Sequence, residues 1–225
     1  MQRRFVFALF AAALVLPALA ARPTSGFAAE KLSGQPSAAE APFVAKAVAV
    51  LSARFPTPAA ARRAGYLRFT DEDDTGAISY ANRQWTSADV EHPSQLWFDA
   101  SDHLIGADYS VPVTGKKPPE LFGLRPDRWQ KFGLHAHYGL VGPNGTIYGG
   151  VGDKTLAKGG ASSAKPTARA LVRAGIAKNV NDVRFVFTFP SIWDVSIWLV
   201  PNPNGAFAEK NPDVKPVNPP KEMKM

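Results

Sequence analysis

The stretch VRFVFTFPSIWDVSIWLV, residues 183–200, contains two runs in which every second side chain is apolar. Such period-two alternation among β-branched and aromatic residues is typical of strands with one buried face. The dipeptide Pro190-Ser191 between the runs predicts a turn. The stretch therefore predicts two strands, over residues 183–189 and 192–200, in a mainly antiparallel sheet.

Five further segments have a similar composition and a length typical of strands. They are residues 77–80, 95–99, 103–110, 134–141 and 146–151. Tight turns at 99–102 and 142–145 predict two antiparallel hairpins. Apolar residues at helical spacing predict helices over 43–55, 58–64 and 168–174. The expected fold class is α+β, a single domain with a mainly antiparallel sheet of about six or seven short strands and two or three short packed helices.

The two ends of the chain differ in composition from the middle. Residues 1–20 combine two early arginines, a short apolar run and small residues at cleavage spacing, which predicts a secretory signal peptide. Residues 21–41 are expected to form a flexible leader, and the Pro- and Lys-rich residues 210–225 a disordered tail. The domain is then expected over 42–209. The protein is expected to be secreted or periplasmic, with no transmembrane segment after the signal is removed.

The chain has no cysteine and a formal net charge of +7. The lack of cysteine excludes disulfides, thiolate metal ligands and a cysteine nucleophile. Basic runs are no longer than two residues and are not interleaved with aromatic residues, so nucleic acid is not expected as a partner. Residues 71–108 contain nine acidic residues and one basic residue, a balance that favours cations there.

The strongest candidate site lies in the predicted strand of residues 134–141, which reads LHAHYGLV. Alternation places His135 and His137 on one face and the apolar residues on the other. Two imidazoles two residues apart can converge on one divalent transition metal, and zinc, iron, copper and manganese all suit such ligands. Candidates for a third ligand are His92, His103, Asp99, Asp102 and Asp194. The alternative is a pair of partly exposed histidines bonded only to their neighbours.

Polar residues of the stretch 183–200 extend this candidate site. Arg184, Thr188, Asp194 and Ser196 lie on the faces opposite the apolar rows. If both strands join the strand of His135, these residues share one polar face with the histidines. Bordered by Tyr109 or Trp97, such a face predicts a small-ligand site in which Arg184 would bind an anionic group. A half-solvated antiparallel sheet has the same sequence pattern.

The acidic turn at residues 71–78 has part of the pattern of a calcium-binding loop. Asp71, Asp73 and Thr75 stand at the first, third and fifth positions. Asn82 replaces the bidentate glutamate at the twelfth position, so the pattern predicts a weak calcium site. The alternative is a solvated acidic turn.

Three functions remain open. The first is an exported protein that binds a small ligand or a divalent metal at a polar sheet face around His135 and His137. The second is a metal-dependent hydrolase or oxygenase that uses this histidine pair. The third is a structural or envelope-associated protein without a ligand. The sequence establishes no cofactor and does not decide whether the protein is an enzyme.

Overall fold

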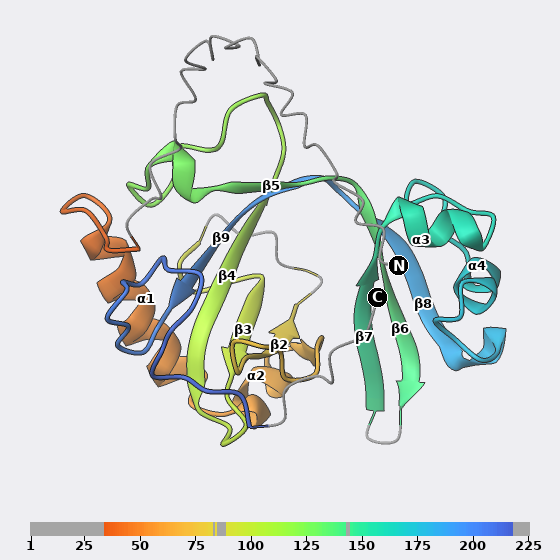
Figure 1. Ribbon diagram of the computed structural model, residues 1–225, viewed down its shortest axis with the longest axis horizontal. Coiled ribbons are helices and arrows are strands. Elements are labelled where there is room, and N and C mark those ends of the chain that lie inside the picture. The colour runs from red at the N-terminus through yellow and green to blue at the C-terminus, as the bar shows by residue number, and fades with distance from the viewer. Residues whose placement is uncertain (1–33, 83, 85–88, 143–144, 218–225) are drawn as a thin grey trace, which may run out of the picture. The chain divides into compact units, whose positions relative to one another are not determined.

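Two antiparallel sheets, one of six strands and one of three, form the described structure (Figure 1). This computed structural model describes residues 34–82, 84, 89–142 and 145–217, all of which belong to one compact unit. The signal peptide expected over 1–20 lies outside the described residues. No helix in the described ranges is long and apolar enough to cross a membrane.

All seven strands expected from the sequence are present, and two short ones are added. The six-stranded sheet has the order β1 (Leu67–Arg68), β2 (Ile78–Ala81), β3 (Gln95–Phe98), β4 (Leu104–Pro112), β9 (Ile192–Trp198) and β5 (Gln130–Phe132). The three-stranded sheet has the order β7 (Gly145–Val151), β6 (His135–Gly142) and β8 (Val183–Phe189). The expected hairpins are confirmed, because β3 pairs with β4 and β6 with β7. The α+β fold class is therefore correct.

The stretch that predicted the sheet links two sheets and does not form a hairpin. β8 pairs with β6, whereas β9 pairs with β4 and β5. Pro190-Ser191 is thus the point at which the chain passes from the small sheet to the large one. Alternation fixes which side chains share a face of a strand but not which strand lies beside it, so a hairpin and a crossing have the same local pattern.

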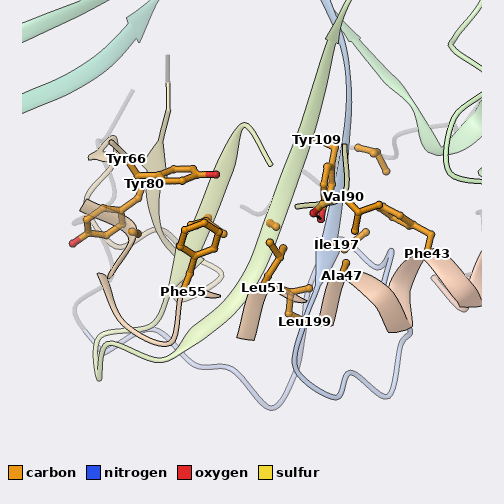
Figure 2. Packing of buried hydrophobic residues seen from close by; sticks show 14 of the residues in the cluster. Phe43, Ala47, Leu51, Phe55, Tyr66, Tyr80, Val90, Tyr109, Ile197 and Leu199 are labelled. Atoms are coloured by element: carbon orange, nitrogen blue, oxygen red, sulfur yellow. Dashed lines mark hydrogen bonds between the residues drawn. The ribbon is translucent and has the colours of Figure 1, made fainter. Parts of the chain in front are cut away.

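One face of the large sheet packs against the two N-terminal helices, α1 (Ala41–Arg54) and α2 (Pro58–Arg63). In Figure 2, Phe43, Ala47 and Leu51 of α1 lie against Tyr109 of β4 and against Ile197. Burial of this apolar stripe is the main stabilising contribution here. The hydroxyl of Thr57 accepts a hydrogen bond from the Ala60 N–H and caps α2.

One face of the small sheet is covered by α3 (Asp153–Lys158) and α4 (Ala168–Arg173), which lie beside β8 in Figure 1. Leu156 of α3 and Leu171 of α4 are fully buried against Ala136 of β6. The Thr167 hydroxyl caps α4 through the Ala170 N–H. The sequence predicts α4, whereas α3 is one and a half turns long and lacks a side-chain cap, so its residues give little helical signal. Two single-turn 3₁₀ helices complete the fold, at Pro126–Arg128 and Val180–Asp182.

Long-range contacts also involve described residues outside the expected boundaries of 42–209. Glu40, from the end of the expected leader, is fully buried and forms an ion pair with the nearly buried Arg128 at 3.0 Å. Burial alone would raise the pKa of Glu40, but hydrogen bonds from Arg128, Ser37 and Arg125 outweigh it and lower the pKa to about 2. At the other end, the Val217 N–H donates to the Glu72 carboxylate. Both contacts are long-range, so composition alone does not reveal them.

Candidate functional site

A cavity of about 370 Å³ lies between the two sheets. Both sheets contribute side chains to it, and its lining combines carboxyl, hydroxyl, amide and imidazole groups with aromatic rings. The lining residues are Phe69, Asp73, Ser79, Ala81, Asn82, Ser94, Gln95, Trp97, Asp108, Ser110, Phe132, His135, His137, Tyr148, Phe189, Ile192, Asp194 and Ser196. This volume lies within the range of small-molecule sites, roughly 300–1,000 Å³.

The large sheet forms one wall because its strands alternate. On β4, Ala107, Tyr109 and Val111 belong to the core that packs on α1, while Asp108 and Ser110 line the cavity. Tyr109, which the sequence places at the border of a ligand site, therefore does not line this cavity. Its ring is fully buried on the core side, where its hydroxyl donates to the Val90 carbonyl at 2.9 Å and burial raises its pKa.

Two crossed Ser–Asp pairs occupy the centre of this wall. Asp108 stands opposite Ser196 in the register of β4 and β9, and Ser110 stands opposite Asp194. The Ser196 hydroxyl donates to Asp108 Oδ1 at 2.5 Å, and the Ser110 hydroxyl donates to Asp194 Oδ1 at 2.5 Å. Each carboxyl thus has a serine donor from the neighbouring strand, and both carboxyls face one cavity.

Burial controls the charge of these two aspartates. Asp108 is 6% exposed and Asp194 is 9% exposed. Burial raises the pKa of Asp108 to about 6, although hydrogen bonds from Ser196 and from the Trp97 indole oppose the rise. Burial and the neighbouring Asp108 charge raise the pKa of Asp194 well above its ordinary value. The pair therefore holds protons at a pH where exposed aspartates have lost them.

Trp97 of β3 lines the cavity, as the sequence analysis expects for a ligand site. Its indole Nε1–H donates to Asp108 Oδ2 at 2.9 Å. Gly106 lies opposite Trp97 on β4, and a Cβ at Gly106 would collide with the indole ring. The glycine therefore lets the ring lie flat on the sheet and fixes the donor beside the carboxylate.

The small sheet forms the opposite wall, with His135 and His137 on the same face of β6 as predicted. Ala136 between them is fully buried on the other face, against α3 and α4. The neighbouring residue Leu134 is 43% exposed and is not part of the core that alternation assigns to it. The ring of His137 stacks on Phe189 of β8, with centroids 4.2 Å apart.

The prediction that Arg184 and Thr188 share the face of the histidines is wrong. The register pairs His135 with Phe189 and His137 with Phe187, so the phenylalanine row lies on the histidine side. Arg184 is exposed and does not line the cavity, and the Thr188 hydroxyl donates to the Ser163 carbonyl. Cross-strand neighbours point to the same side of a sheet, and this pairing is not encoded within either strand.

Tyr148 joins the two histidines in one chain of hydrogen bonds. His135 Nδ1 lies 2.9 Å from the Gly133 carbonyl, the two Nε2 atoms lie 2.9 Å apart, and His137 Nδ1 lies 2.5 Å from the Tyr148 hydroxyl. A carbonyl only accepts, so His135 Nδ1 carries a proton. With His135 neutral, His137 donates from Nε2 to His135 and accepts at Nδ1 from the Tyr148 O–H.

The buried position of His137 keeps its ring neutral. It is 7% exposed, and burial, followed by the charge of His135, lowers its pKa to about 3. A neutral ring has one N–H only, which is what gives the chain of hydrogen bonds its direction. Protonation of His135 would reverse that direction, because its Nε2 would then donate to His137.

Four of the five other metal-ligand candidates do not line the cavity of the histidine pair. His103 and Asp99 pair with each other at 3.2 Å across the β3–β4 turn, which also contains Asp102, and His92 pairs with Asp89 at 2.7 Å. Asp194 shares the cavity with the histidines. Within the described ranges, no three His, Asp or Glu side chains converge closely enough to hold a metal ion.

The carboxylate of Asp73 stabilises the acidic turn through hydrogen bonds within the turn. Asp73 Oδ1 accepts hydrogen bonds from the Thr75 N–H, the Thr75 hydroxyl and the Ala77 N–H. Asp71 is exposed and forms an ion pair with Arg68 at 3.1 Å. The structure therefore does not bring Asp71, Asp73 and Thr75 together as calcium ligands.

Sequence analysis does not single out Asp108, Ser110 or Tyr148. A signal is present for Asp108, since an aspartate in the middle of a predicted strand is unusual unless it is paired or functional. Tyr148 gives no such signal, because tyrosine is an ordinary strand residue.

Comparisons of this chain with protein-family models, with curated proteins and with solved structures find no match.

Proposed function

We propose that this protein binds a small organic ligand in the cavity between its two sheets. The proposal rests on one observation, that a cavity of about 370 Å³ is lined by two carboxyls from one sheet and two imidazoles from the other. Buried polar groups in a sheet face reduce stability unless they are paired, so a polar wall of this extent favours a binding role over simple packing. The proposal includes export to the periplasm or the medium, which the sequence of residues 1–20 supports.

A fragment screen followed by protein-observed NMR tests this proposal. A fragment that binds here is expected to shift the ring signals of His135 and His137 together with the indole N–H of Trp97. The double variant His135→Ala/His137→Ala is expected to weaken binding at least tenfold. The double variant His92→Ala/His103→Ala is the matched control, since neither residue lines the cavity. If no fragment shifts both walls, the ligand-binding proposal fails and a structural or envelope role becomes the better account.

A metal site at the histidine pair is the second candidate, and a specific geometry favours it. Two nitrogens 2.9 Å apart can both lie about 2.0–2.1 Å from one ion. Oxygen partners at both Nδ1 atoms resemble the outer contacts that orient metal-binding histidines. Such an ion would activate water or dioxygen in a hydrolase or oxygenase.

Elemental mass spectrometry of the untagged protein distinguishes the two candidates. The metal candidate requires close to one equivalent of zinc, iron, copper or manganese. That metal should be lost in His135→Ala/His137→Ala and retained in His92→Ala/His103→Ala. A protein that takes up none of these ions after dialysis against each of them would overturn the metal candidate and leave the organic ligand.

A further inference from the structure

One oxygen of Asp194 faces the cavity without a partner. Its Oδ1 accepts the Ser110 hydroxyl, and Oδ2 has no hydrogen bond to any described residue. The side chain is nonetheless about nine-tenths buried. Both oxygens of Asp108, by contrast, have donors, from Ser196 and Trp97. A carboxyl oxygen that is left without a partner in a cavity is suited to a ligand that donates a hydrogen bond or brings positive charge.

Aromatic rings line the same cavity as this oxygen. Phe132 of β5 stands opposite Ile192 on β9, two pairs along from Asp194, and side chains at those positions share a face of the sheet. Phe132, Phe69 and Phe189 all line the cavity. The face of an aromatic ring attracts a cation within about 6 Å of its centroid. Carboxyl and ring faces together form the environment that stabilises an ammonium group.

Aspartates outnumber strongly basic side chains in the described lining of the cavity. Three aspartates line the cavity, and the described lining contains no lysine or arginine. His137 is neutral, because burial lowers its pKa to about 3. A ligand that balances the charge of these aspartates would therefore be positively charged. A cavity of about 370 Å³ is much larger than one bare ion requires, so an organic cation fits this volume better.

We infer that the ligand is a small organic cation whose ammonium nitrogen lies between Asp194 Oδ2 and the ring of Phe132. This inference rests on the proposed binding function and specifies the chemical class of its ligand. Matched probes test it. Choline and 3,3-dimethylbutan-1-ol have the same shape but differ in charge, as do butylammonium and butan-1-ol. Each cation is expected to bind at least tenfold more tightly than its neutral partner, measured by calorimetry at pH 7.5 and by the NMR signals of Trp97 and His135.

Asp194→Asn is the decisive variant. It keeps the shape of the side chain and an oxygen for the Ser110 hydroxyl but removes the negative charge. The preference for the cation is expected to fall below about threefold, while the neutral probes are little affected. Asp102→Asn, at the exposed β3–β4 turn, is the matched control and should keep the full preference. Far-UV circular dichroism and the melting temperature establish that both variants are folded.

Binding should also depend on pH. The titratable groups that face the site are Asp73, Asp108, Asp194, His135, His137 and Tyr148. Since burial raises the pKa of both Asp108 and Asp194, the empty cavity holds protons that a bound cation displaces. Affinity for choline or butylammonium is expected to increase several-fold from pH 5 to pH 7. Calorimetry in two buffers of different ionisation enthalpy should show proton release.

The outcomes separate this inference from the function on which it rests. Equal binding of neutral and charged probes, with shifts at both walls, would overturn the organic-cation inference and leave the binding function intact. The same result follows if fragments bind but no ammonium probe does. If neither the probes nor the fragment library shifts Trp97 and the histidines, both proposals fail. Binding of a divalent metal alone, lost in His135→Ala/His137→Ala, would replace both with the metal candidate.

Discussion

The two walls of the cavity remove charge in opposite ways. On the large sheet, burial raises the pKa of Asp108 to about 6, so this acid keeps its proton up to a higher pH than an exposed aspartate does. On the small sheet, burial lowers the pKa of His137 to about 3, so the base remains without one. The same desolvation acts on both, and each group adopts its neutral form. Burial of the two walls therefore reduces the charge that the empty cavity carries below what the same groups would carry in water.

The walls also differ in what supports them. The large sheet packs on an extensive core from α1, α2 and the adjoining loops. The small sheet is backed by a cluster of six buried residues, three of which are alanines. The stabilising free energy is roughly proportional to the apolar area that is buried. The small sheet is therefore expected to be the less stable region.

Leucine truncation in the two cores should give the largest effect. Leu51 of α1 and Leu171 of α4 are both fully buried, and each change to alanine is expected to lower the free energy of unfolding by about 3 kcal/mol. Native-state hydrogen exchange should then differ between them. Leu171→Ala is expected to expose amides of β6 and β8 while β4 and β9 stay protected, whereas Leu51→Ala lowers protection in both sheets. If Leu171→Ala lowered amide protection equally in both sheets, the expected difference in stability between the two sheets would be contradicted.

The opposed pKa shifts predict opposed pH dependences of stability. Between pH 4 and 6, folded Asp108 holds a proton that the unfolded chain has released, so its contribution to stability falls as pH rises. Between pH 3 and 6.5, the unfolded chain protonates His137 and the folded protein does not, so that contribution rises with pH. The two slopes partly cancel in the wild type.

Single variants should reveal each slope. Relative to the wild type, the unfolding free energy of Asp108→Asn should rise more steeply from pH 4 to 6, by up to about 3 kcal/mol at about 1.4 kcal/mol per pKa unit. For His137→Gln, the unfolding free energy should rise less steeply than that of the wild type over the same pH range. Urea titrations at half-unit pH steps measure both. Parallel curves for the wild type and the two variants would show that neither group is shifted as described.

Removal of one hydroxyl from each wall should give the smallest effect. Tyr148→Phe deletes the donor to His137 Nδ1, and Ser196→Ala deletes one donor to Asp108. Each variant is expected to lower the free energy of unfolding by about 1–2 kcal/mol, because a buried acceptor loses its partner. Ser196→Ala should also raise the pKa of Asp108, measured by ¹³C NMR. Ser101→Ala, at the β3–β4 turn, is the control and should change neither quantity. An unaltered ¹⁵N shift of His137 Nδ1 in Tyr148→Phe would exclude the hydrogen-bond chain.

Part of the candidate site could be predicted because strand alternation is local. His135 and His137 share a face, and Asp194 and Ser196 lie opposite an apolar row, because consecutive side chains point to opposite sides. Trp97 at the cavity follows the same rule. Tyr109 shows the limit of this rule. It lies on the core face of β4, whereas Asp108 of the same strand faces the cavity. Alternation defines the two faces of a strand and does not say which one is buried against a helix.

The sequence by itself determined seven of the strands, two hairpins, three helices and the faces on which the histidines and Asp194 lie. Each of these depends on residues within a few positions of one another, through side-chain periodicity, turn geometry or a capping hydroxyl. Only the tertiary structure decided that residues 183–200 cross between two sheets, that phenylalanines flank His135 and His137, and that Asp108 joins Asp194 in one cavity. Those features depend on which distant strands pair and in which register, and that pairing is set by the packing of the whole chain.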